Sequence, residues 1–183
     1  MENMIIRVFE GCEIEIVVPK NYNQGKYIRY FINECLRKPF HRYQNWGFCG
    51  ASGTAYWDNL VSKINPLDST GFGSGTDELI PGNKYIIRFY QSRVDNPRRE
   101  DIVAFLKEQG ALFPGMPGIL LAYELTNGRI AEKMAKFADR TLSFHETSSK
   151  ISTIERWIGK HEHIVYQADE VQKSDLILCF KES

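Results

Sequence analysis

Residues 119–125, Ile-Leu-Leu-Ala-Tyr-Glu-Leu, form a nearly continuous apolar run directly after a proline- and glycine-rich turn at residues 113–118. Apolar and polar positions do not alternate along this run, which is typical of a segment buried on both faces. We therefore expect residues 119–125 to form a central strand of a sheet. A chain with such a segment must fold around it, and 183 residues suffice for one hydrophobic core.

The other patterns predict strands and helices without a regular strand-helix-strand alternation. Strands are expected at residues 4–9, 12–18, 84–91, 162–167 and 175–180, with the first two joined as a hairpin. Helices are expected at residues 24–37, 54–64, 97–109 and 130–140, with a short one near residues 151–158. This mixture favours one α+β domain over residues 1–183, with an antiparallel-dominated mixed sheet and helices packed against it.

The charge of the whole chain gives no reason to expect a polyanionic partner, because 23 basic and 23 acidic residues balance. Residues 20–46 are locally different. They combine six basic side chains with a single acid and several aromatic rings. The basic residues are Lys20, Lys26, Arg29, Arg37, Lys38 and Arg42, and the aromatic ones include Tyr22, Tyr27, Tyr30, Phe31, Phe40, Tyr43 and Trp46. This basic aromatic segment predicts a surface for an anionic protein or nucleic-acid partner.

Cys49 lies in a glycine-rich stretch, residues 44–57, ahead of the helix expected at residues 54–64. A helix start offers unpaired N–H groups and partial positive charge, which favour a thiolate. Cys49 is therefore a candidate nucleophile, with His163 on a late strand as general base and Asp175 as the group that orients it. Gln44 is a candidate oxyanion donor, and this chemistry requires no cofactor.

This arrangement resembles the papain-like cysteine hydrolases, which place a helix-start Cys early, a His on a late strand and an Asp, Asn or His on the next strand. In that superfamily an oxyanion-hole Gln often precedes the Cys by five or six residues, as Gln44 precedes Cys49 here. Gly47-Phe-Cys49-Gly-Ala-Ser52 is also similar to the Gly-x-Cys pattern of some bacterial effector proteases. The resemblance implies a cysteine peptidase or amidase acting on a peptide or protein. Aligning the papain motif differently would put Ser52 in place of the nucleophile.

Other features leave alternatives open. His145 or His161 are alternatives to His163 as the base. His161 and His163 together with Asp169 or Asp175 would also suit a metal ion, although no motif with metal-ligand spacing accompanies them. The glycines at positions 71, 73 and 75 suit either an active-site flap or a plain surface loop.

The cysteines and the N-terminus bear on the compartment. Cys12, Cys35, Cys49 and Cys179 are widely spaced and predict mainly free thiols in a reducing environment. The first residues have neither a basic start nor a long apolar run, so we expect no signal peptide and no membrane span. The expected location is cytoplasmic, or exported without a cleaved signal peptide.

Overall fold

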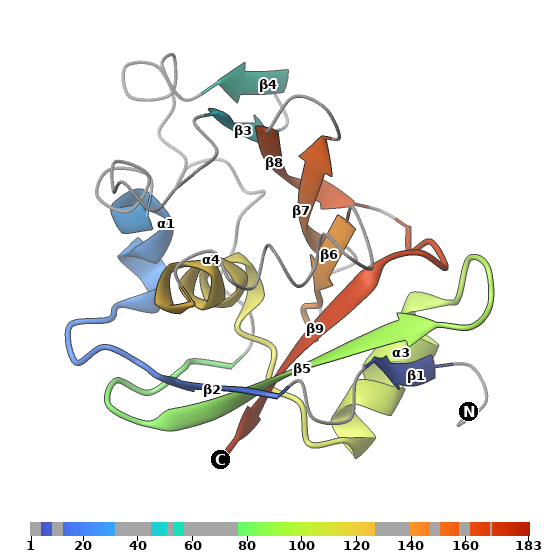
Figure 1. Cartoon of the computed structure of the whole chain (residues 1–183), viewed down its shortest axis with the longest axis horizontal. Coiled ribbons are helices and arrows are strands. Elements are labelled where there is room, and N and C mark those ends of the chain that lie inside the picture. Colours follow the sequence, from blue (N-terminus) through green and yellow to red (C-terminus); the bar gives the residue numbers. More distant parts are fainter. Residues whose placement is uncertain are drawn as a thin grey trace.

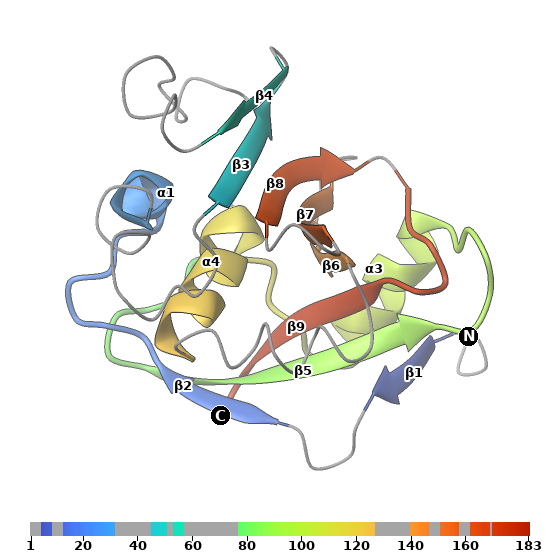
Figure 2. The same cartoon turned by 45° about the horizontal axis from the view of Figure 1, so that its top comes forward.

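The computed structural model describes residues 5–8, 13–31, 45–50, 53–56, 77–126, 140–146, 151–157, 162–168 and 170–183. These residues form an α+β fold built on one mixed sheet, shown in two views in Figures 1 and 2. The strands are β1 (Ile5–Val8), β2 (Ile14–Val17), β3 (Asn45–Gly50), β4 (Gly53–Tyr56), β5 (Lys84–Ser92), β6 (Arg140–Ser143), β7 (Ile151–Trp157), β8 (Glu162–Ala168) and β9 (Leu176–Glu182). The helices are the 3-10 turn η1 (Gln24–Lys26), α1 (Tyr27–Tyr30), α3 (Arg99–Glu108) and α4 (Gly115–Leu125).

Across the sheet the strands follow the order β1-β5-β9-β6-β7-β8-β3-β4, and β2 also pairs with β5. Strands β6 and β9, and strands β3 and β8, run parallel, while the other pairs are antiparallel. The antiparallel pair β5 and β9 lies side by side in both views. The expected antiparallel-dominated mixed sheet is therefore present in the described residues.

Side chains of β9 enter two hydrophobic clusters alternately. Leu176, Leu178 and Phe180 pack with α4, whereas Ile177 and Cys179 pack with α3. Because successive strand residues point to opposite faces, α3 and α4 cover opposite faces of the central strands. The sheet is thus buried on both sides at its centre.

The expectation of a central strand at residues 119–125 is wrong, because these residues belong to helix α4. Nine of the eleven residues of α4 are buried, so the helix has no polar face. Its apolar residues therefore do not recur with the period of an amphipathic helix. A fully buried helix and a fully buried strand give the same apolar pattern. Pro117 is compatible with the helix because it lies in the first turn, where its missing N–H group costs no helical bond.

The expected hairpin between the first two strands is also wrong. Both strands exist, but each pairs antiparallel with β5: Ile5 opposite Ser92 and Ile14 opposite Ile87. They therefore follow one another along the same edge of β5 and run in the same direction.

Two of the predicted helices coincide with strands. Residues 53–56 form β4, which pairs with β3 so that Gly50 faces Gly53. Glycines at both positions disfavour a helix, and only two residues separate them, which suits a hairpin. Residues 151–157, which overlap the short helix expected near residues 151–158, form strand β7. Ile151 and Ile154 pack in different hydrophobic clusters, so their three-residue spacing reflects burial on both faces of a strand.

Several expected elements are confirmed. The strands predicted at residues 84–91, 162–167 and 175–180 correspond to β5, β8 and β9. The predicted helix at residues 97–109 is α3, and Arg98 is the residue before its first turn. The predicted helix at residues 24–37 begins as η1 and α1, with Asn23 Oδ1 accepting from the backbone N–H of Lys26. Residues 57–64, 71–75 and 130–139, on which other expectations fall, lie outside the described residues. Among the helices described here, none has the length and apolar character needed to cross a bilayer.

Candidate functional site

The structure places Cys49 inside a strand and not at the start of a helix. Strand β3, which contains it, pairs with β4 on one side and with β8 on the other. The argument that a helix N-terminus stabilises a thiolate therefore does not apply to Cys49.

Cys49 and His163 lie on neighbouring strands but not next to one another. His163 is the register partner of Trp46, and Cys49 lies three residues further along β3. With about 3.3 Å per residue and about 4.8 Å between strands, the two Cα atoms are about 11 Å apart. Positions three apart on a strand also belong to opposite faces of the sheet. The backbone register thus does not bring these two positions together as a catalytic pair requires.

Asp175 is separated from His163 by the width of two strands. It directly precedes β9, and β6 and β7 lie between β9 and β8. The Asp175 carboxylate is buried, accepts from the backbone N–H of Gln172 at 2.7 Å and lies 3.4 Å from Arg140 Nε. Asp175 therefore holds the turn before β9 and the start of β6 together, and it does not orient His163. Gln44, Ser52, His161 and Asp169 lie outside the described residues.

His145, an alternative base, is buried with its Nε2 atom 2.9 Å from Ser152 Oγ. Burial, with a smaller contribution from the positive charge of Arg99, lowers the pKa of His145. Ser152 is fully buried, so this pair is closed to a substrate. Within the part of the chain that the structure describes, no group of three His, Cys, Asp or Glu residues is placed to hold a metal ion.

A pocket lies instead where the segment after β2 passes over the end of α4. It has a volume of about 230 Å³, and six of its eight lining residues belong to the basic aromatic segment, residues 20–46. The lining residues are Pro19, Asn21, Tyr22, Asn23, Lys26, Tyr27, Tyr30 and Glu124. We call this hollow the tyrosine pocket.

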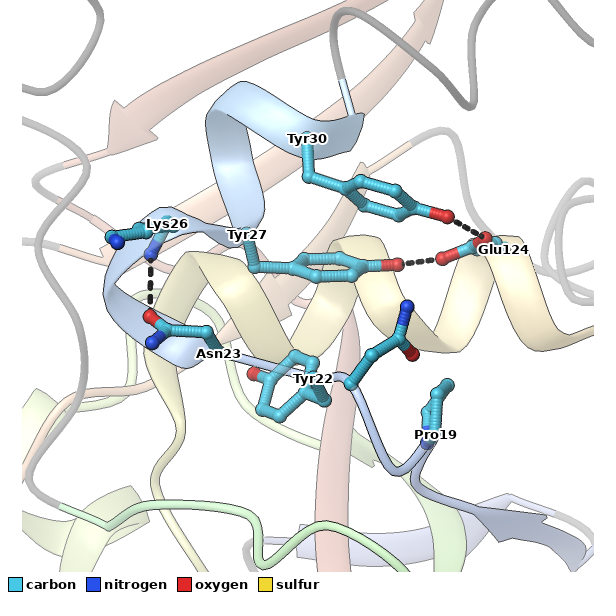
Figure 3. Close-up of a pocket in the computed structure, with 8 residues that line it drawn as sticks. Pro19, Tyr22, Asn23, Lys26, Tyr27, Tyr30 and Glu124 are labelled. Atoms are coloured by element: carbon cyan, nitrogen blue, oxygen red, sulfur yellow. Dashed lines mark hydrogen bonds between the residues drawn. The ribbon is translucent and has the colours of Figure 1, made fainter.

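Three tyrosine rings follow one another along the tyrosine pocket (Figure 3). The ring centroids of Tyr22 and Tyr27 are 5.0 Å apart, and those of Tyr27 and Tyr30 are 5.6 Å apart. Tyr22 and Tyr27 are buried, whereas 38% of Tyr30 is exposed. Tyr27 also contacts Phe31, which is fully buried. Tyr22 belongs to the hydrophobic core.

Glu124 connects α4 to this row of rings. The hydroxyl groups of Tyr27 and Tyr30 donate to its two carboxylate oxygens, the Tyr30 bond being 3.4 Å long. In Figure 3 both hydroxyl groups point toward Glu124, and Lys26 and Asn23 lie on the opposite side of Tyr27. The tyrosine pocket therefore carries a negative group at one end and a positive group at the other.

Buried hydrogen bonds fix the base of the tyrosine pocket. The hydroxyl of Tyr22 donates to Gln24 Oε1 at 3.2 Å, and burial, with the nearby charge of Glu78, raises the pKa of Tyr22. Gln24 Oε1 also accepts from the backbone N–H of Leu79 at 3.1 Å, and Gln24 Nε2 donates to the carbonyl of Asp77 at 2.8 Å. These bonds attach the part of the pocket around Gln24 to residues 77–79, which precede β5.

Sequence reasoning found the basic aromatic segment but missed Glu124, which is 97 positions from Tyr27. The one signal for Glu124 was a lone acid in an otherwise apolar run, and that run was interpreted as a strand. A carboxylate kept in such a run needs a hydrogen-bonding partner when it packs against the core.

Comparisons with protein-family models, with curated proteins and with solved structures found no match for this chain. Function is therefore inferred from the residues of the site. The papain-like resemblance and the thiol-dependent hydrolase stay predictions.

Proposed function

We propose that this protein is a binding module and that its tyrosine pocket, with the lysines around it, holds a segment of an acidic peptide or protein. The observation that carries this proposal is the coincidence of two independent features. The segment with the largest local excess of basic and aromatic residues also supplies most of the lining of a concave site. Pockets with a few polar groups among aromatic walls are typical ligand sites.

An acidic peptide suits this surface better than a nucleic acid. Sequence-independent binding of single strands uses several exposed rings on which bases stack, together with a strongly positive groove. Tyr22, Tyr27 and Phe31 are buried, and Tyr30 is the exposed ring among the aromatic residues of the segment whose burial the structure describes. The formal net charge of the chain is zero, which further weakens the argument for a polyanion.

The geometry favours this proposal over the thiol-dependent hydrolase. Binding requires only a concave surface with complementary charges. Lys26 is exposed and lines the tyrosine pocket, and Lys20 is exposed between the two lining residues Pro19 and Asn21. A hydrolase requires a nucleophile and a base within hydrogen-bond reach. The register of β3 and β8 keeps Cys49 and His163 apart.

The test is fluorescence anisotropy with a labelled peptide of alternating glutamate and glycine, about twelve residues long, at about 50 mM and about 300 mM salt. Reversing one charge about 5 Å from a partner charge in water changes the interaction by about 1.6 kcal/mol, so Lys26→Glu is expected to weaken binding roughly tenfold. The higher salt concentration is expected to weaken binding of the wild-type protein.

The matched control is Lys173→Glu, which changes the net charge equally. Lys173 is exposed in the turn that precedes β9. In Figure 1 that turn and α1 lie on opposite sides of the molecule. Equal losses for the two variants would mean that only net charge matters and would overturn the proposal. Tighter binding of an oligothymidylate than of the acidic peptide would assign the surface to nucleic acid.

A further inference from the structure

We infer that the outer edge of strand β2 takes up an extended segment of the acidic partner as an additional strand, and that this segment continues past Pro19 to the tyrosine pocket. This inference deepens the proposed function, on which it rests, by naming the backbone conformation in which the partner binds.

A hydrogen bond at the end of β2 shows which of its residues face β5. Val18 continues the register of β2, and its backbone N–H donates to the carbonyl of Asn83 at 3.0 Å. The N–H and C=O groups of successive strand residues point to opposite edges, so Ile16 also faces β5. The backbone groups of Glu15 and Val17 therefore point away from β5.

The other edge of β5 gives the same assignment independently. The backbone N–H of Ser183 donates to the carbonyl of Lys84 at 3.4 Å, so Lys84 faces β9. Tyr85, one residue further along β5, then faces β2. Because Tyr85 is the register partner of Ile16, the residues on either side of Ile16 again lie at the outer edge.

This outer edge is open to another strand. Within the described residues β2 pairs with β5 alone, and an open edge presents N–H and C=O groups that bond to an extended chain. Proline and lysine commonly protect such edges, and residues 14–18, Ile-Glu-Ile-Val-Val, contain neither. Val17 is 51% exposed, and its β-branched side chain suits a cross-strand contact with a similar residue.

The short length of β2 indicates that its partner must also bind elsewhere. The strand has four residues, and an isolated pairing of this length is weak. A partner strand that runs along β2 beyond Val17 reaches Pro19, which lines the tyrosine pocket. Main-chain bonds at a sheet edge combined with side-chain contacts in an adjoining pocket are a recurring way to bind peptides.

The side chains along this path select the sequence of the partner. Glu15 is exposed and forms an ion pair with Lys84 at 2.9 Å, so an acidic residue directly opposite Glu15 gains nothing. Lys20 is exposed directly after Pro19, so acidic residues are favoured beyond the paired stretch. The fitting partner is therefore an extended peptide with a short β-branched stretch flanked by acidic residues.

Amide hydrogen exchange on the unmodified protein tests this inference directly. The probe, here called the strand peptide, is Glu-Gly-Glu-Gly-Val-Thr-Val-Gly-Glu-Gly-Glu, which has the same sequence in either direction. In the free protein the N–H groups of Glu15 and Val17 should exchange quickly, and that of Ile16 slowly because it faces β5. A saturating concentration of the strand peptide should slow exchange at Glu15 and Val17 at least about tenfold.

Two variants and a matched peptide test the same contact through affinity. We expect the strand peptide to bind at least about tenfold more tightly than a Glu-Gly peptide with the same number of glutamates, because glycine disfavours the extended strand. Val17→Pro removes the outward N–H but no bond to β5, and it should abolish this difference. Val17→Thr keeps the N–H and a β-branched side chain, so it is the control and should retain the difference. Equal affinities of the unmodified protein for both peptides would overturn the inference.

The exchange measurement separates this inference from the proposed function. Binding of the strand peptide that leaves exchange at Glu15 and Val17 unchanged would overturn the inference and leave the acidic-partner proposal standing. Protection of these two groups without peptide, increasing with protein concentration, would also overturn it, because a second copy of the chain would then occupy the edge. If neither peptide binds, the proposed function fails and the inference fails with it.

Discussion

Replacing Gln24 with leucine should detach the wall of the tyrosine pocket from the body of the protein. Gln24 is only 5% exposed and bonds to two backbone groups, the carbonyl of Asp77 and the N–H of Leu79. Leucine has a similar volume and offers neither a donor nor an acceptor, so both groups would be left buried without their partner. Each unsatisfied buried group costs about 1–3 kcal/mol, so the two together give an expected loss of about 2–6 kcal/mol in the free energy of unfolding.

Urea unfolding followed by circular dichroism measures this loss, with Gln172→Leu at an exposed position as the control. Local opening of residues 19–31 would relieve this cost, and amide hydrogen exchange detects that case because the Leu79 N–H would lose its protection. A loss below about 1 kcal/mol together with unchanged protection of Leu79 would refute the role given to Gln24.

Three further predictions concern the core. Burial lowers the pKa of His145 below its ordinary value of 6.5, so the unfolded chain takes up the proton first. The contribution of neutral His145 to the free energy of unfolding should be fully present above pH 6.5 and should be lost as the pH falls below that value. In urea titrations at several pH values, His145→Gln should reduce this pH dependence. The same pH dependence in both proteins would contradict the prediction. Burial raises the pKa of Cys179 to about 12, so a thiol reagent at pH 8 should modify Cys179 far more slowly in the native protein than in urea, and similar rates would count against its burial. A Cβ atom at Gly118 would lie 2.3 Å from Pro114 Cγ, so Gly118→Ala should destabilise the protein by about 1–3 kcal/mol despite the better helix propensity of alanine; a rise in melting temperature would contradict this close packing.

The strands that the sequence predicted correctly are those with clear local patterns. Residues 84–91 alternate on a strand that is exposed at its start and buried further along, and β8 and β9 are separated by a charged turn. The errors come from segments whose surroundings decide their structure. Helix α4 is buried on nearly all sides, so its sequence carries no period that distinguishes it from a strand. Strands β3 and β4 contain three glycines, which sequence rules assign to loops or helix starts.

The residues of the candidate site also divide into those that a local sequence pattern predicts and those that only the fold brings together. Local composition was enough to select the basic aromatic segment, since Lys26 and Tyr30 belong to the tyrosine pocket that it forms. Glu124 is brought to these residues only by the packing of α1 against α4, which no local pattern encodes. The relative placement of Cys49 and His163 could not be predicted from the sequence for a related reason. The proximity of Cys49 and His163 depends on strand register, and the order of residues along a chain does not fix register.

The central claim is that the tyrosine pocket is a binding site, and the ring resonances of its tyrosines test it most directly. In a nuclear magnetic resonance titration with the acidic peptide of alternating glutamate and glycine, the ring signals of Tyr22, Tyr27 and Tyr30 should shift together and saturate. The signal of Tyr90 should stay in place, because its ring packs against Phe105 in the cluster on the other face of the sheet. Saturable binding that leaves all three pocket tyrosines unshifted would contradict the claim.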